Sequence, residues 1–171
     1  MRAAATAARP EPGRGAQVRA ARGAHVSVRR AVRARAVPTA GQLAAWAAAA
    51  LGRRAAGSEI SVLLVGRARS RALNARYRHR DRATNVLSFP APPTVRARSG
   101  LLGDLVICPA VLRAEAQAQG KRLRAHWAHL VVHGVLHLVG FDHEQTAQAR
   151  RMERREVRVL RRLGFPDPYR L

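Results

Sequence analysis

Three histidines, His133, His137 and His143, have the spacing in this sequence that is best suited to chemistry. His133 and His137 are four residues apart, so a helix would place both imidazoles on one face. Gly140 can adopt the left-handed conformation that ends a helix, which would turn the chain and bring His143 toward the same point. We therefore predict that the three imidazoles bind one zinc ion (Zn2+) per chain and leave a fourth position for water, whose pKa falls to about 7.

Two more histidines, His126 and His129, precede the motif on the same predicted helix. Their spacing from His133 allows a supporting role behind the ligands, and an ordinary packed or surface histidine is the competing interpretation. Asp142 is a candidate acceptor for a hydrogen bond from a ligating imidazole. The lone cysteine, Cys108, follows a strand and is expected to be a packed thiol rather than a ligand.

The histidine register also matches the pattern H-E-x-x-H-x-x-G-x-x-H of the metzincin proteases at all three histidines and at the glycine. The glutamate that acts as general base in that pattern is replaced here by Gly134. Peptide hydrolysis needs that base, whereas phosphodiester cleavage relies more on stabilisation of developing charge by metal and arginine. We therefore favour a nuclease, and a metallopeptidase with a metzincin-like register is the alternative.

The charge of the chain points to a polyanionic partner. Its 171 residues include 32 basic and 10 acidic ones, a formal net charge of +22. Every basic residue except Lys121 is an arginine, whose planar guanidinium matches two phosphate oxygens at once. The positive electrostatic field of this net charge raises the encounter rate with nucleic acid and makes binding depend strongly on salt. The competing explanation is a GC-rich genome, because alanine and arginine are both very abundant.

The pattern along the chain predicts a single α+β domain over residues 24–171, with a small mixed β-sheet of about four strands covered by about five helices. Residues 1–23 have almost no large apolar side chain, and we expect a disordered Ala/Arg-rich extension there. Residues 91–100 are expected to form a loop. The expected strands are 25–28, 59–66, 85–90 and 101–108, and the expected helices are 39–51, 68–77, 110–119, 123–139 and 146–163.

Three motifs resemble one family. The sequence from His133 to His143 is similar to H-G-x-L-H-L-x-G-[YF]-D-H, a signature of the YbeY endoribonucleases. Residues 73–90 resemble that family's L-N-x-x-[YF]-R-x-x-[DN]-x-x-T-[DN]-V-L-S-F-P, and residues 102–107 resemble its L-G-D-[IV]-x-I. The similarity extends from about Glu59 to the C-terminal Gly-Phe-Pro-Asp-Pro-Tyr that ends at Tyr169.

This resemblance implies a zinc-dependent single-strand endoribonuclease that acts in ribosomal RNA processing, in 16S rRNA 3′-end maturation and in ribosome quality control. The implied partners are ribosomal RNA, the small ribosomal subunit, ribosomal proteins and an assembly GTPase. The three histidines match the metal ligands of the family, and Arg78 matches its functional arginine. A ribosome-assembly factor that binds RNA without cutting it, around a structural zinc, is a further alternative.

Four residues outside the histidine motif are candidates for contact with substrate. Arg78 precedes a turn and could point its guanidinium at a scissile phosphate, although a solvated arginine is the simpler interpretation. Asn85, Ser88 and Asp104 are candidate substrate-binding residues at strand positions, and hydrogen bonding at turns and strand ends would explain them equally well.

The sequence also bears on location. No segment approaches the roughly 20 apolar residues of a membrane helix. A single cysteine cannot form an internal disulfide, which fits a reducing compartment. We expect a cytoplasmic protein that does not bind membranes.

Overall fold

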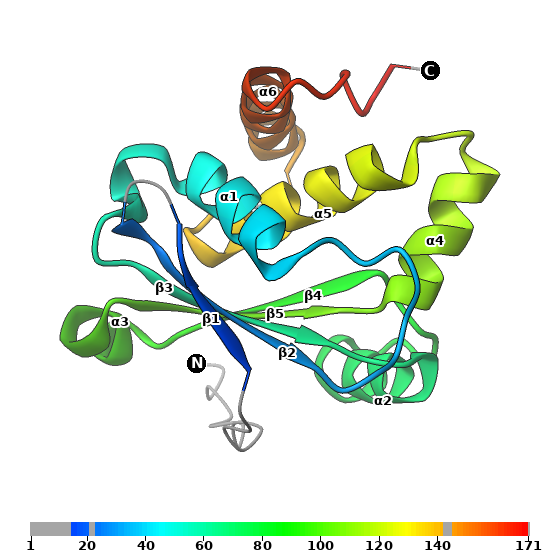
Figure 1. Ribbon diagram of the computed structural model, residues 1–171, viewed down its shortest axis with the longest axis horizontal. Coiled ribbons are helices and arrows are strands. Elements are labelled where there is room, and N and C mark those ends of the chain that lie inside the picture. Colours follow the sequence, from blue (N-terminus) through cyan, green and yellow to red (C-terminus); the bar gives the residue numbers. More distant parts are fainter. Residues whose placement is uncertain (1–14, 21–22, 142–144, 171) are drawn as a thin grey trace.

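The computed structural model describes residues 15–20, 23–141 and 145–170. Within that part of the chain, five strands form one sheet in the order β1-β2-β3-β5-β4 (Figure 1). The strands are β1 (Ala16–Arg19), β2 (His25–Arg30), β3 (Glu59–Leu64), β4 (Val86–Pro90) and β5 (Leu101–Ile107). The helices are α1 (Ala40–Leu51), α2 (Arg67–Arg78), α3 (Pro93–Ser99), α4 (Pro109–Ala118), α5 (Leu123–Leu138) and α6 (Thr146–Arg162).

The sheet is mixed. Strands β2, β3 and β5 are parallel, and the two outer strands, β1 and β4, each pair antiparallel with their neighbour. The crossover connections that parallel pairing requires contain α1 between β2 and β3, and α2, β4 and α3 between β3 and β5. Because β4 is the last strand of the sheet, one of its edges has no strand beside it in the described structure.

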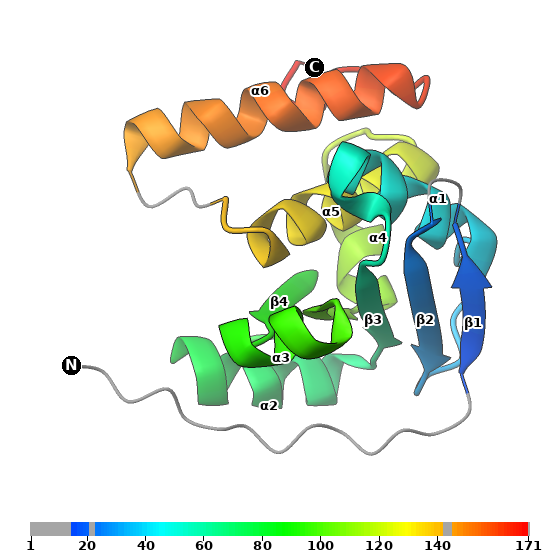
Figure 2. The same cartoon turned by 90° about the vertical axis from the view of Figure 1, so that its left-hand side faces the viewer.

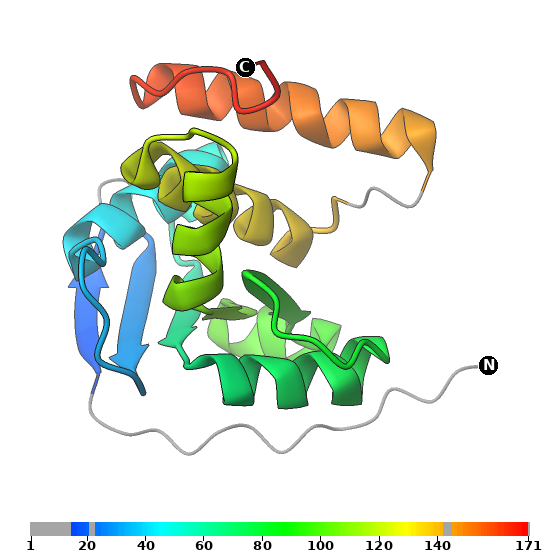
Figure 3. The same cartoon turned by 90° about the vertical axis from the view of Figure 1, so that its right-hand side faces the viewer.

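Helices cover both faces of the sheet in layers. Val62 and Leu105 point into the larger core, which contains residues of α1, α5 and α6. Their neighbours Leu63 and Val106 point to the other face, where Leu73 of α2 packs against them. Figures 2 and 3 show the resulting order of layers, from α2 through the sheet and α5 to α6 on the outside. None of the described helices is long and apolar enough to span a bilayer.

The predicted α+β class and single mixed sheet are confirmed, with five strands in place of about four. The additional strand is β1, whose residues belong to the predicted N-terminal extension. It pairs with β2 from Ala16 opposite Val28 to Arg19 opposite His25. Backbone pairing of this kind needs few apolar residues, which is why the composition did not predict it. Residues 1–14 and 21–22 of the expected extension lie outside the described residues.

The expected loop at residues 91–100 contains the short helix α3. Pro93 occupies its first turn, where the absent N–H is not needed and the fixed φ angle already suits a helix. Gly100 ends the helix in the left-handed conformation at φ 70°. At α1 the Thr39 hydroxyl caps the start of the helix, because it accepts from the Gln42 backbone N–H over 3.2 Å.

Helix α5 packs tightly on the sheet at Gly134. A Cβ atom on this residue would lie 2.9 Å from Leu105 Cδ2 and 3.3 Å from Ser88 Oγ, so position 134 faces the sheet. The Ser88 hydroxyl donates a hydrogen bond to the Gly134 carbonyl over 3.2 Å. The missing side chain therefore lets the histidine helix pack directly on β4 and β5.

We predict that Gly134→Ala lowers the free energy of unfolding by about 1–3 kcal/mol, because the added methyl overpacks this contact. Urea denaturation of the metal-free protein measures the change. Gly41→Ala is the matched control, because its Cβ would meet Thr39 Oγ1 at an ordinary 3.9 Å. This control should be neutral or more stable by up to about 1 kcal/mol. Equal effects of the two substitutions would contradict the tight contact.

Candidate metal centre

Four histidines form a row along one face of α5. His126, His129, His133 and His137 follow one another at intervals of three or four residues, which keeps them on the same side of the helix. The centroids of successive rings are 6.3, 6.2 and 4.7 Å apart. The shortest of these separations joins His133 and His137, so the pair predicted from the sequence is adjacent.

A buried carboxylate from α6 supports the middle of this row. Glu156 has no exposed surface, and its Oε1 lies 2.8 Å from His133 Nδ1. Its Oε2 lies 3.1 Å from His129 Nε2 and also accepts a hydrogen bond from the Tyr169 hydroxyl. Burial alone would raise the pKa of Glu156, but the hydrogen bonds from His129, His133 and Tyr169 and the charge of His133 together lower it to about 2. Glu156 is therefore an ionised hydrogen-bond acceptor.

The donors in this region suit a metal ion such as zinc. Ligand atoms of His129, His133 and Glu156 lie within 4.8 Å of one another, so this group could hold a metal ion. Imidazole nitrogens and carboxylate oxygens are donors that zinc accepts. Helix α5 ends at Leu138, and Gly140 has a φ angle of 91°, which is the left-handed turn that the sequence predicted.

Two residues of the predicted centre, the ligand His143 and its neighbour Asp142, lie outside the described residues. The described structure therefore shows two of the three expected ligands, His133 and His137, on one helix.

A second carboxylate, Glu115, contacts His126 at the N-terminal end of the histidine row. Glu115 of α4 accepts hydrogen bonds from Asn85 Nδ2 at 2.8 Å and from His126 Nε2 at 3.2 Å. Burial raises the pKa of Glu115, but these two hydrogen bonds and the charge of His126 outweigh it and lower the pKa below its ordinary value. Asn85, a candidate for substrate binding, thus joins α4 and α5 to the start of β4.

The remaining candidate residues lie at different places around the sheet. Ser88 is buried between β4 and α5, where it binds the Gly134 carbonyl. Asp104 alternates along β5 with Leu105 of the larger core, so it faces the α2 side of the sheet. Arg78 is exposed at the C-terminal end of α2. Because α2 and α5 cover opposite faces, Arg78 would have to reach around the edge strand β4 to approach the histidines.

The motif that contains Arg78 has a clear structural role. The Asn74 amide donates to the Arg82 carbonyl over 2.8 Å, and the Ser70 hydroxyl donates to the Thr84 carbonyl over 2.8 Å. Arg71 pairs with Asp81 on the surface at 2.6 Å. These contacts hold residues 79–84 against α2 and set where β4 begins.

Comparison with known proteins places the chain in a family. The family model described as Endoribonuclease YbeY matches residues 32–164. The chain belongs to the Endoribonuclease YbeY family. An Endoribonuclease YbeY from Pseudomonas putida is 53% identical over 135 residues, which cover 78% of this chain and 86% of that protein. The Endoribonuclease YbeY from Nitrosococcus oceani is 48% identical over 146 residues, which cover 84% of this chain and 95% of that protein.

The fold is shared with a solved structure. The solution structure of TM1509 from Thermotoga maritima aligns with a TM-score of 0.54 over 84% of this chain and 99% of that one, at 21% sequence identity. At this identity the likeness establishes the fold alone, and it agrees with the α+β architecture described above.

Sequence reasoning missed two residues that shape the candidate metal centre, Glu156 and Arg96. Glu156 was not singled out, although it is the one acidic residue in the stripe formed by Met152, Val159 and Leu160 on the buried side of α6. A charged residue at a core position of an amphipathic helix is a signal for a buried partner, and it was available in the sequence.

Arg96 of α3 was also missed, and no sequence pattern indicated it. Its Nη2 donates to the Leu138 carbonyl over 2.7 Å. This carbonyl belongs to the last turn of α5, where backbone acceptors lack partners within the helix and a cation is favoured. Arg96 therefore secures the end of the helix one residue after His137.

We predict that Arg96→Met frays the C-terminal turn of α5 and lowers the free energy of unfolding by about 1–2 kcal/mol, because a charge-assisted hydrogen bond is lost. Amide hydrogen exchange should show faster exchange in residues 138–141. Arg98→Met, an exposed arginine on the same helix, is the control and should leave exchange unchanged. Unchanged protection in Arg96→Met would contradict the role of this bond.

Proposed function

We propose that this chain is a zinc-dependent endoribonuclease that cuts single-stranded ribosomal RNA, in 16S rRNA 3′-end maturation and in ribosome quality control. The observation that carries the proposal is the adjacent pair His133 and His137 on α5, with His133 held by the buried carboxylate of Glu156. Membership of the YbeY family supports the reaction class. The buried free thiol of Cys108 is consistent with work in the reducing cytoplasm.

The proposal assigns the zinc ion to His133, His137 and His143. When bound by three neutral imidazoles, zinc supplies Lewis-acid activation of water and of the phosphodiester. The chain contributes the orientation of the His133 and His137 rings, since α5 aligns them and Glu156 and Glu115 hold the histidine row at two points. Arg78 is proposed to stabilise charge on the scissile phosphate from beyond the edge of β4.

The packing of Gly134 argues against the peptidase alternative. The metzincin pattern places its general base at this position. Here a Cβ would lie 2.9 Å from Leu105 Cδ2 and 3.3 Å from Ser88 Oγ, so a glutamate at this position would have to displace Leu105 or α5. Phosphodiester cleavage does not need a base at that point.

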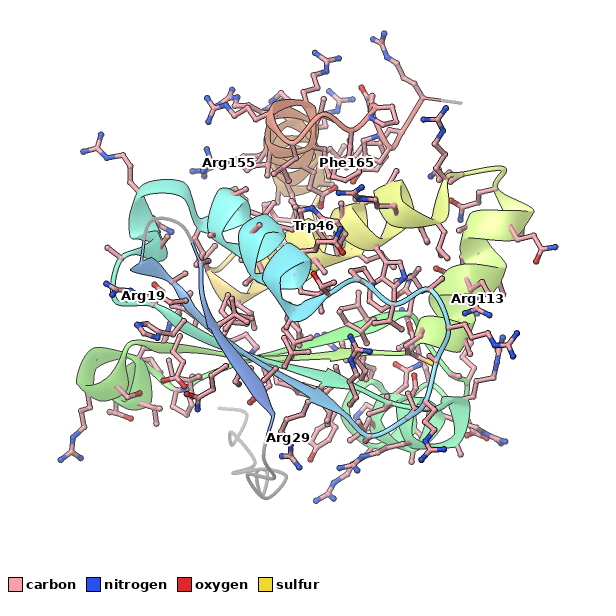
Figure 4. The ribbon with its side chains drawn as sticks, viewed as in Figure 1. Arg19, Arg29, Trp46, Arg113, Arg155 and Phe165 are labelled. Atoms are coloured by element: carbon pink, nitrogen blue, oxygen red, sulfur yellow. The ribbon has the colours of Figure 1, made fainter. Side chains whose placement is uncertain are left out.

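The outer face of α6 supports binding of RNA. Between residues 145 and 170 the chain has eight arginines and three acidic residues. An open hollow of about 740 Å3 lies on this face, and its lining includes Arg154, Arg158, Arg161, Arg162, Tyr169 and Arg170. Figure 4 shows side chains with nitrogen tips extending outward around α6. Guanidinium groups and an exposed aromatic ring are the groups that bind a single strand.

The proposed partners suit the same contact between arginine and phosphate. Ribosomal RNA and the small ribosomal subunit present dense phosphate, which suits an arginine-rich surface. We further propose contact with ribosomal proteins and an assembly GTPase, as expected for the family.

We predict that the zinc-loaded protein cleaves a single-stranded RNA bearing the unprocessed 3′ end of 16S rRNA, and that His137→Ala lowers the rate by at least about 100-fold. Loss of a ligand should cost more than the roughly 10–100-fold typical of residues behind the ligands. Gel analysis of end-labelled RNA measures cleavage, and His25→Ala, an exposed histidine on β2, is the control. Cleavage that persists after zinc removal would contradict the proposal.

A thermal melt with and without chelator separates catalysis from a purely structural metal. A nuclease should lose turnover on chelation while the sheet and helices stay folded. Unfolding on chelation, together with RNA binding but no cleavage by the zinc-loaded protein, would instead favour the assembly-factor alternative.

We predict that changing Arg154, Arg158 and Arg161 to glutamine weakens binding of single-stranded RNA and lowers the slope of log K against log salt by about 2, since each lost phosphate contact accounts for about 0.7. Fluorescence anisotropy at several salt concentrations measures both quantities. The control changes three scattered exposed arginines, Arg53, Arg98 and Arg124, and so removes the same charge. Equal effects of the two triple variants would mean that general charge, rather than the α6 face, binds RNA.

A further inference from the structure

Glu156 is a fully buried acid within an arginine-rich helix. Its four nearest neighbours in the sequence include Arg154 and Arg155, yet its side chain points away from solvent toward α5. A buried charge is expensive unless donors surround it, and here both oxygens accept hydrogen bonds from other elements. The positions of these donors therefore show which groups the carboxylate holds in place.

We propose that Glu156 is a positioning residue that fixes the tautomer and orientation of His133, so that Nδ1 donates to the carboxylate and Nε2 is directed to the metal. The proposal rests on the proposed zinc centre and deepens it. The two ring nitrogens of a histidine are distinct, and the hydrogen bond at one nitrogen decides which nitrogen can serve as a ligand. The 2.8 Å separation between His133 Nδ1 and Glu156 Oε1 is that of a charge-assisted hydrogen bond.

The contacts of Glu156 favour this role over direct binding of the ion. Oε1 accepts from His133, and Oε2 accepts from both His129 and Tyr169. Glu156 is completely buried, whereas His133 keeps a quarter of its side chain exposed, so of the two His133 is the group that faces solvent. A carboxylate behind a ligating imidazole is the common arrangement at zinc sites.

The C-terminal segment completes the network through Tyr169. The ring of Tyr169 lies edge-on to His129, with centroids 5.5 Å apart, while its hydroxyl reaches Glu156. Lys121 Nζ donates to the Pro168 carbonyl over 2.8 Å, and Phe165 packs edge-on against Trp46 of α1 at 5.8 Å (Figure 4). These anchors place the phenol, which lies beyond the 32–164 range of the family match. The Gly-Phe-Pro-Asp-Pro-Tyr motif thus acquires a role in supporting the metal helix.

The test compares Glu156→Gln with Glu153→Gln, an exposed glutamate one turn earlier on the same helix. Glutamine keeps the shape of Glu156 but accepts at one oxygen only, so its NH2 group must face His133 or the His129 and Tyr169 pair. Competition with a chelator of known affinity should show zinc binding weakened about 10–100-fold in Glu156→Gln and unchanged in Glu153→Gln. Tyr169→Phe, which removes one donor, should show a smaller loss in the same direction.

A second readout needs neither activity nor metal. Nitrogen-15 NMR of the metal-free wild-type protein should show His133 protonated at Nδ1, and Glu156→Gln should lose or mix that tautomer. A wild-type His133 protonated at Nε2 with a bare Nδ1 would overturn the proposal, even if the glutamine variant failed to fold. Zinc affinity that is equal in Glu156→Gln and Glu153→Gln would overturn it as well.

The electronic spectrum of the cobalt-substituted protein distinguishes positioning from ligation. The same ligand-field bands in Glu156→Gln and wild type, with weaker binding, support a residue behind the ligand. A changed coordination number would overturn the proposal and make Glu156 a ligand. If zinc binding depends on Glu156 as expected but the protein cuts no RNA, only the nuclease proposal is contradicted. If cleavage depends on zinc but Glu156→Gln binds zinc as tightly as wild type, only the positioning role is contradicted.

Discussion

The architecture around the histidine row depends on the need to pair one buried carboxylate. Moving an ion of this kind out of water costs several kcal/mol even after the protein relaxes, and only well-placed donors offset it. Glu156 obtains those donors from α5 and from the C-terminal segment at once. The relative positions of three parts of the chain are therefore coupled, because displacing any one of them leaves the charge with fewer donors. This explains how α6, the outermost layer, is held in register with a helix that also packs on the sheet.

The opposite side of α5 is constrained by steric contact rather than by charge. Gly134 allows the helix axis to approach β4 and β5, and the Ser88 hydroxyl then reaches a carbonyl within the helix. Arg96 fixes the last turn of the helix from a third direction. The imidazoles of His133 and His137 thus project from a helix that is restrained on its sheet side, at its end and on its α6 side. A metal-binding helix benefits from such support, since a small displacement of a ring changes the distance to the ion.

The sequence predicted the features that depend on local spacing and left out those that depend on distant contacts. The helix that carries His133 and His137, its end before Gly140 and the mixed sheet follow from periodicity and from turn residues, and the structure confirms them. Strand β1 and helix α3 were missed because one is stabilised by backbone pairing and the other is a single proline-initiated segment of seven residues. The partners of the histidines come from positions 11 to 27 residues away in the chain, and single-sequence periodicity cannot pair them.

The candidate substrate residues show why a shared motif does not assign roles by itself. Asn85 and Ser88 belong to one recognisable stretch, and each makes a hydrogen bond that joins β4 to a helix. A residue can be required for a site because it places the strand beside the histidine helix α5, without touching RNA. Arg78 differs from Asn85 and Ser88, since its side chain is exposed at the C-terminal end of α2. Arg78 is therefore one of the exposed residues of this motif whose side chains point into solvent rather than into the core. That exposure is what a group needs if it is to meet a phosphate that arrives from solvent.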